Sequence, residues 1–255
     1  LPVSTRSTES FRLPGFPTPY WSAPRAALYL GDVRACLRSL PVRSVHCCVT
    51  SPPYWGLRDY GTGVFEGGNS ECDHIEVYAA DKARKSMLGP KRYLGISLPE
   101  TNAAYTSLAR QYTGQCRKCG AKRIDMQIGA EPQADCGTRG QAQCGQCFCC
   151  AMVSVFREVH RVLRDDGTLW LNLGDTFADG GQGMVPELVA LALREDGWLL
   201  RQDIIWYAPN KIPEPVTDRF VKSHEHIYLL AKSKDYYYDH VGVQEPLPVV
   251  ALGVA

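Results

Sequence analysis

A cysteine-rich stretch interrupts an otherwise regular pattern of strands and helices, and this interruption limits the possible folds more than any other feature. Most of the eleven cysteines lie between Cys72 and Cys150. From Gly61 to about Gln146, apolar periodicity is lost and glycine, polar residues and cysteine predominate. Because the chain begins without a secretory signal pattern, its thiols are expected to be free or metal-bound rather than paired in disulfides. The stretch is therefore predicted to be an insertion that needs metal to become ordered.

The spacing of the cysteines predicts zinc ligands. Two residues separate Cys116 from Cys119, a spacing that lets both thiolates bind one ion while backbone amides point at the sulfurs. Cys72 and His74 complete a tetrahedral set. A second set consists of Cys136, Cys144, Cys147 and Cys150. One or two structural zinc ions are expected, with Cys149 left over; the ligand pairing stays open, and the alternative is that some of these residues are ordinary buried or free thiols.

Strands and helices alternate on both sides of this stretch. Strands are predicted at residues 27–30, 44–49, 168–173, 203–207 and 226–231, and helices at 33–40, 153–163 and 186–195. Residues 232–235 are predicted to turn the chain into a partner strand at 236–239. The alternation predicts an α/β fold with a mostly parallel sheet, helices on both faces and a hairpin at one edge.

The length of 255 residues allows one large α/β domain or one domain with an insertion. The predicted divisions are a loose lead-in at 1–26, a catalytic domain at 27–60 and 151–240, the insertion at 61–150 and a tail at 241–255. No apolar run is long enough to cross a membrane, and a net charge of +1 gives no global positive field. These features predict a cytoplasmic protein, and the initial Leu1 in place of Met predicts a fragment.

Ser51, Pro52, Pro53 and Tyr54 follow a predicted strand, where α/β sheets carry their active-site groups. An amino group on a nucleobase is a poor nucleophile because its lone pair is delocalised into the ring. Acceptors at its two N–H groups, here the Ser51 hydroxyl and the Pro52 carbonyl, would favour its reactive form. The prolines would hold that carbonyl outward, and Tyr54 could stack on a base rotated out of the duplex. The alternative is a simple proline turn with aromatic packing.

The segment TSPPYWGLRDYG resembles motif IV of the DNA amino-methyltransferases, the S-adenosylmethionine-dependent enzymes of restriction-modification and phage systems. The resemblance continues through VFREVHRVLRDDGTLWLNLGDTF, DIIWYAPNKIPEP and SHEHIYLLAKSKDYYYD, and covers most of residues 27–239. It implies a Rossmann-like, three-layer methyltransferase sheet that binds S-adenosylmethionine and double-stranded DNA. It also implies that Ser51 to Tyr54 form the catalytic loop and that Asp32 contacts the adenine of the cofactor.

In the same family, a serine that opens this tetrapeptide usually accompanies methylation of cytosine at N4, whereas aspartate or asparagine usually accompanies adenine. We therefore expect a cytosine-N4 enzyme, with adenine-N6 methylation as the alternative. A cytosine-C5 enzyme is disfavoured because it needs a Pro-Cys nucleophile, and no cysteine here follows a proline. The histidines have no nucleophile-elbow serine to serve, which disfavours a hydrolase.

Asn172, Gly174 and Asp175 lie at the end of the predicted strand 168–173 and face the predicted cleft. They are candidate cofactor-binding residues; the alternative is a tight turn with Asp175 as a helix cap.

The family's later cofactor loop, a strand ending in Asp-Pro-Phe before a Gly-rich turn, does not occur in this sequence. By the resemblance, the absent strands would lie at the centre of the sheet, between the strand before Asp32 and the strand before Ser51. We expect the sheet to be incomplete, with a second chain or a missing C-terminal half carrying the loop. We therefore expect this chain alone to bind the cofactor weakly or not at all. The alternative from another functional class is a non-catalytic, zinc-dependent DNA-binding remnant.

Basic residues in the insertion are candidates for phosphate contacts or for a solvated face. They are Arg117, Lys118, Lys122 and Arg123, and five more within residues 82–92.

Overall fold

The computed structural model describes residues 18–56, 63–74, 92–93, 96–97, 116, 118–124, 127–131, 133–136, 144–178, 181–210 and 216–245. The predicted basic stretch at 82–91 and Arg117 lie outside these residues. Within them the centre of the fold is a four-stranded sheet in the order β11-β12-β8-β3. Its strands are β3 (Val45–Thr50), β8 (Leu163–Leu173), β11 (Leu199–Tyr207) and β12 (His224–Ala231).

The sheet is mixed rather than mostly parallel. β3 and β8 are parallel, whereas β12 is antiparallel to β8 and β11 is antiparallel to β12. An antiparallel pair does lie at one edge of the sheet, but it consists of β11 and β12 and not of the predicted strands at 226–231 and 236–239. The predicted partner strand at 236–239 is wrong, because these residues form no strand in the structure.

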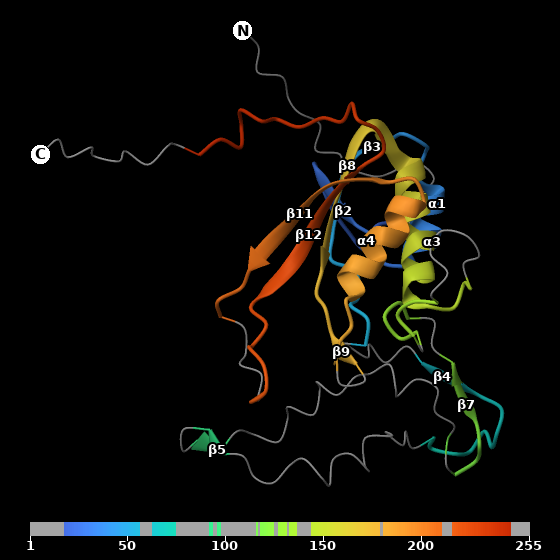
Figure 1. Cartoon of the computed structure of the whole chain (residues 1–255). Helices are drawn as coiled ribbons and strands as arrows, with labels where there is room; N and C mark the ends of the chain where they lie inside the picture. The colour runs from blue at the N-terminus through green and yellow to red at the C-terminus, as the bar shows by residue number, and fades with distance from the viewer. Residues whose placement is uncertain are drawn as a thin grey trace, which may run out of the picture.

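Three helices pack side by side on one face of this sheet: α1 (Val33–Ser39), α3 (Phe148–Val162) and α4 (Val185–Glu195). α3 lies between the other two (Figure 1). Alternation along β8 explains the core, because Leu169, Leu171 and Leu173 are buried toward the helices. The two-residue period of the strand thus places these three leucines on the face that the helices cover.

The opposite face of the sheet carries no helix among the described residues, so the described part has two layers and the three-layer arrangement is not formed within it. Val49 of β3 is 77% exposed and Trp206 of β11 is 57% exposed. Both side chains alternate with residues that face the helices.

The first predicted strand does not join the main sheet. β2 (Ala26–Leu28) pairs with β1 (Trp21–Ala23) as a separate antiparallel hairpin, part of which lies in the predicted lead-in. This strand therefore does not border the expected gap. Among the described strands, β3 is the last in its sheet, and the absence of strands beside it stays a prediction. A three-residue strand is too short to identify a sheet partner from its own sequence.

The insertion contributes small elements. β4 (Val64–Glu66) pairs with β7 (Lys122–Ile124), and β5 (Arg92–Tyr93) pairs with β6 (Ile96–Ser97). A further short hairpin, β9 (Phe177–Ala178) with β10 (Gly181–Gln182), follows β8. No described helix is long and apolar enough to cross a membrane.

Helix α3 begins at Phe148, five residues before its predicted start, so the last cysteines of the insertion lie in its first turn. The Cys147 sulfur accepts a hydrogen bond from the Cys150 amide at 3.4 Å and caps the helix. Cysteine is not among the residues usually preferred at the N-cap, which explains why the sequence predicted a helix start five residues too late.

Candidate active site and cysteine clusters

The turn at residues 51–54 lies where two parallel strands end. Ser51 directly follows β3, and Gly174 directly follows β8. Because parallel strands end at the same edge, the two segments meet there. A methyl group added to Gly174 would lie only 2.6 Å from Cε2 of Tyr54, so glycine lets the tyrosine ring pack directly on the backbone. The structure thus brings the predicted Tyr54 and Gly174 together.

Glu225 orients the tyrosine. The Tyr54 hydroxyl donates to Oε2 of Glu225 at 2.8 Å, and Nδ2 of Asn172 donates to the same oxygen at 3.2 Å. Glu225 lies near the start of β12, which runs antiparallel to β8 and therefore begins at this edge. Sequence reasoning missed this residue, although it lies in the segment SHEHIYLL that carries the family resemblance.

Asn172 keeps one unused acceptor. Its Oδ1 is buried and, within the described part of the chain, has no hydrogen-bond partner. Because a buried carbonyl oxygen without a donor is costly, this atom is suited to receive an N–H or O–H from a ligand. Ser51, three residues before the tyrosine, is exposed.

Two other predicted cofactor residues serve as helix caps. Asp32 accepts from the Arg34 and Ala35 amides at 3.1 Å and begins α1, and the Ala35 hydrogen bond lowers the pKa of its carboxyl. Asp175 accepts from the Met184 and Val185 amides and so caps α4 from nine residues away. The capping alternative for Asp175 is thus what the geometry displays.

The cysteines gather in two clusters of four ligands, and within each cluster all the ligand atoms lie within 4.8 Å of one another. We call Cys72, His74, Cys116 and Cys119 the outer cluster, and Cys136, Cys144, Cys147 and Cys150 the inner cluster. This grouping is the one that the sequence spacing suggested. All eleven cysteines are free thiols, so no disulfide competes for them.

The distances fit tetrahedral zinc. Two thiolates on one zinc, each at roughly 2.3 Å, lie about 3.8 Å apart. The measured Sγ to Sγ distances are 3.7 Å for Cys72 and Cys116, 3.9 Å for Cys136 and Cys150, and 3.8 Å for Cys144 and Cys150. Nδ1 of His74 lies 3.4 Å from Sγ of Cys119. Both donor sets therefore fit zinc in chemistry and in size.

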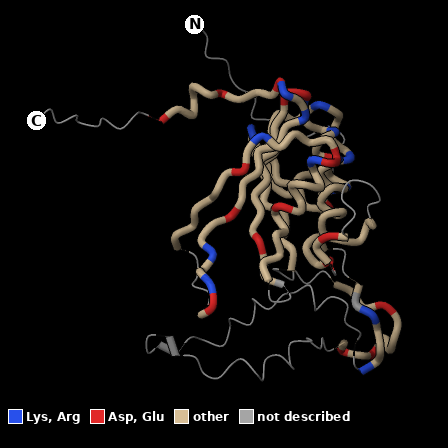
Figure 2. Tube along the Cα trace, viewed as in Figure 1, with Lys and Arg blue, Asp and Glu red and all other residues tan. Residues whose placement is uncertain are grey.

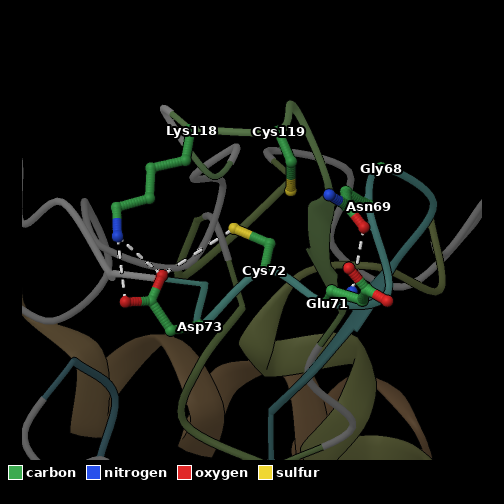
Figure 3. A pocket seen from close by; sticks show the side chains of 7 residues that line it. All are labelled: Gly68, Asn69, Glu71, Cys72, Asp73, Lys118 and Cys119. Carbon is green, nitrogen blue, oxygen red and sulfur yellow. Dashed lines mark hydrogen bonds and ion pairs between the residues drawn. The ribbon is translucent and has the colours of Figure 1, made fainter.

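The outer cluster is formed by residues that follow β4 and precede β7, and two of its ligands, Cys72 and Cys119, line a pocket (Figure 3). The His74 hydrogen bond holds the pKa of Cys116 at about 6, well below the usual value for a thiol. Lys118 forms an ion pair with Asp73: its Nζ lies 2.7 and 2.9 Å from the two carboxylate oxygens. One of the basic residues that the sequence offered as a candidate for phosphate contacts is therefore already paired within the protein.

Two ligands of the inner cluster, Cys147 and Cys150, lie in the hydrophobic core at the N-terminal end of α3, whereas Cys144 is exposed. Cys147 is fully buried and Cys150 is 6% exposed. Burial raises the pKa of both thiols, because a thiolate loses its hydration there. Cys149, left over in the sequence, packs in the same core, and burial raises its pKa to about 12.

Charge is mixed over the described surface. Figure 2 shows Lys and Arg interspersed with Asp and Glu rather than gathered along one track. This agrees with the net charge of +1.

Comparison with known proteins places this chain in a family. The DNA methylase family model (N6_N4_Mtase) matches residues 45–247. The type II methyltransferases M.Cfr9I of Citrobacter freundii and M.SmaI of Serratia marcescens are each 32% identical, over 86% of this chain. The chain spans 59% of the former and 60% of the latter. No comparison supports a second chain as a partner.

Among solved structures, the PvuII DNA methyltransferase (cytosine-N4-specific) aligns with a TM-score of 0.44 and 14% identity, over 82% of this chain and 50% of that one. With the family model covering most of its length, the chain belongs to the DNA methylase family of N4 and N6 amino-methyltransferases.

Proposed function

We propose that this chain carries the catalytic loop of a DNA methyltransferase that modifies the exocyclic amino group of cytosine at N4. The observation that carries the proposal is that Tyr54 packs on Gly174 and shares the Glu225 carboxylate with Asn172, at the edge where Ser51 follows its strand. Family membership supports methylation of DNA, and the serine that opens the tetrapeptide favours cytosine over adenine.

In this mechanism the chain prepares the nucleophile. The Ser51 hydroxyl and the Pro52 carbonyl accept the two N–H groups of the amino group, which moves its lone pair out of conjugation with the ring. The Tyr54 ring is held against Gly174 on one face and by Glu225 at its hydroxyl, and it stacks on the flipped base through its other face. Pre-positioned groups of this kind lower the barrier because they need no rearrangement during the reaction.

S-adenosylmethionine would supply the methyl group as an electrophilic sulfonium. The unused Oδ1 of Asn172 fits one of its N–H or O–H donors. Asp32, Gly174 and Asp175 remain proposed neighbours of this cofactor, although both carboxylates already cap helices. Two structural zinc ions would occupy the outer and inner clusters.

The test is mass spectrometry of nucleosides from DNA of cells that express the full protein, in a host without endogenous modification. N4-methylcytosine, lost in Ser51→Ala, is the expected result. N6-methyladenine would instead assign the adenine alternative. If a folded, zinc-loaded protein produced neither modified base, the result would support the alternative of a non-catalytic DNA-binding remnant.

A further inference from the structure

A short length of the insertion connects the catalytic turn to the inner cluster. We call residues 127–131 and 133–136 the strap. One end of the strap contacts Tyr54, Trp55 and Gly56, and the other end supplies Cys136 to the cluster. Fewer than ten residues separate the two sites along the chain. Because so short a segment has a limited reach, a displacement of one end is expected to move the other.

The first end is fixed to the turn by hydrogen bonds. The Gly56 amide donates to the Gly129 carbonyl at 2.8 Å, and Nε1 of Trp55 donates to the Glu131 carbonyl at 2.9 Å. The Glu131 side chain accepts from the Gly129 amide at 2.8 Å and so closes the strap on itself. Trp55 is only 8% exposed, which makes its hydrogen bond a protected one.

Close packing fixes the same end. Gly129 has a φ of +95°, and a Cβ added there would lie 2.8 Å from the Tyr54 carbonyl oxygen. The strap therefore touches the backbone of the catalytic tyrosine itself. Only glycine allows both this backbone conformation and this approach.

The second end is joined to α3. The Phe148 amide donates to the Gln133 carbonyl at 3.0 Å, and the Cys149 amide donates to the Ala134 carbonyl at 2.9 Å. These amides are among the donors that the first turn of a helix leaves without internal partners. Cys136 then lies 3.9 Å, sulfur to sulfur, from Cys150 in that same turn.

We propose that the inner cluster, with zinc bound, is a positioning device for the catalytic turn. Zinc would bind Cys136 of the strap and Cys150 of α3 together, and the strap would hold Trp55 and Tyr54 in the geometry that faces Glu225. The catalytic meaning of this link rests on the function proposed above, whereas the mechanical link does not. The outer cluster has no such connection among its described contacts, which stay within residues 63–74 and 116–124.

Two matched variants test the link in the full protein: Cys136→Ser removes a half-buried ligand of the inner cluster, and Cys119→Ser removes a half-buried ligand of the outer one. Each is expected to lose one equivalent of bound zinc, measured by elemental analysis. Hydrogen exchange by mass spectrometry then follows residues 54–56. Cys136→Ser should raise their exchange rate at least about tenfold, and Cys119→Ser should leave it within twofold. Cys136→His, which restores a zinc ligand, should recover the lost protection.

Methylation kinetics give a second reading. In Cys136→Ser the kcat should fall by about tenfold or more while the KM for DNA changes less than threefold, because the turn and not the DNA surface is disturbed. If no variant methylates DNA but the exchange difference persists, the proposed function fails and the mechanical link stands.

Gly129→Ala keeps the test decisive should Cys136→Ser not fold. It leaves every cysteine in place but places a methyl group against the Tyr54 carbonyl oxygen. Gly67→Ala is the control, since Gly67 lies outside the strap and the inner cluster, has a similar positive φ of +75° and has open space around it. Faster exchange at 54–56 with both zinc ions retained is expected for Gly129→Ala alone. Unchanged exchange in a folded Cys136→Ser that lacks one zinc, an equal rise in Cys119→Ser, or absence of zinc from the inner cluster would overturn the proposal.

Discussion

The outer and inner clusters use the same kind of donor set in different surroundings. The outer cluster lies beside the two-stranded sheet of β4 and β7, next to the exposed Lys118 and Asp73 ion pair. The inner cluster has two of its ligands, Cys147 and Cys150, in the main core, where Cys147 also caps α3. From this difference we propose that similar donor sets have unlike roles: with zinc bound, the outer set would order the small sheet of β4 and β7, and the inner set would join the insertion to the domain that carries the proposed catalytic turn.

The largest expected effect concerns the stability of the inner cluster. Cys150→Ser should lower the melting temperature by roughly 10 °C or more, because structural zinc contributes folding free energy directly and its site lies in the core. Cys119→Ser in the outer cluster should lower it by less than half as much. Differential scanning calorimetry of the zinc-loaded proteins measures both, and equal shifts would break the comparison.

The catalytic turn should also be sensitive from the side opposite the strap. Gly174→Ala places a methyl group against the Tyr54 ring, and overpacking of roughly 1–3 kcal/mol corresponds to a loss of about 5- to 150-fold in kcat/KM. Zinc content should stay at two ions. Gly181→Ala, with nothing within 4 Å of its added methyl, is the matched control and should methylate DNA normally.

Loss of the carboxylate behind the tyrosine should have a smaller effect. Glu225→Gln leaves an amide oxygen for the Tyr54 hydroxyl, so kcat should fall about three- to tenfold; Glu225→Ala should cost more. Tyr54→Phe combined with Glu225→Ala should be no worse than the more severe single variant. Additive losses in this double-mutant cycle would show that the hydrogen bond does not couple them.

The smallest effect is expected at the surface of the outer cluster. Lys118→Ala removes an exposed ion pair with Asp73, and such pairs contribute little, so the melting temperature should change by no more than about 2 °C with zinc content intact. A large loss of zinc from this variant would mean that the pair supports the metal site, and the outer cluster would then be less self-contained than its contacts indicate.

Several parts of this arrangement could be predicted because they depend on local pattern. Apolar spacing located α3 and α4, and cysteine spacing grouped the two ligand sets. The role of Glu225 could not be predicted, because it depends on β12 running antiparallel to β8 and starting where β3 and β8 end. The sheet assignment of β2 failed for a similar reason: its partner is the neighbouring β1, and three residues carry too little pattern to decide between partners.

The sequence by itself determined the chemistry available to this protein: a Ser-Pro-Pro-Tyr turn after a strand, two sets of Cys and His donors that could hold a metal ion, and membership in a DNA methylase family. These follow from residue type and short spacing, which the linear order preserves. Only the tertiary structure decided which of these groups meet. Strand direction brings Glu225 and Asn172 to Tyr54, and packing brings Gly129 of the insertion against the same residue, because contacts between segments far apart in the chain are set by the sheet and the core rather than by any local spacing.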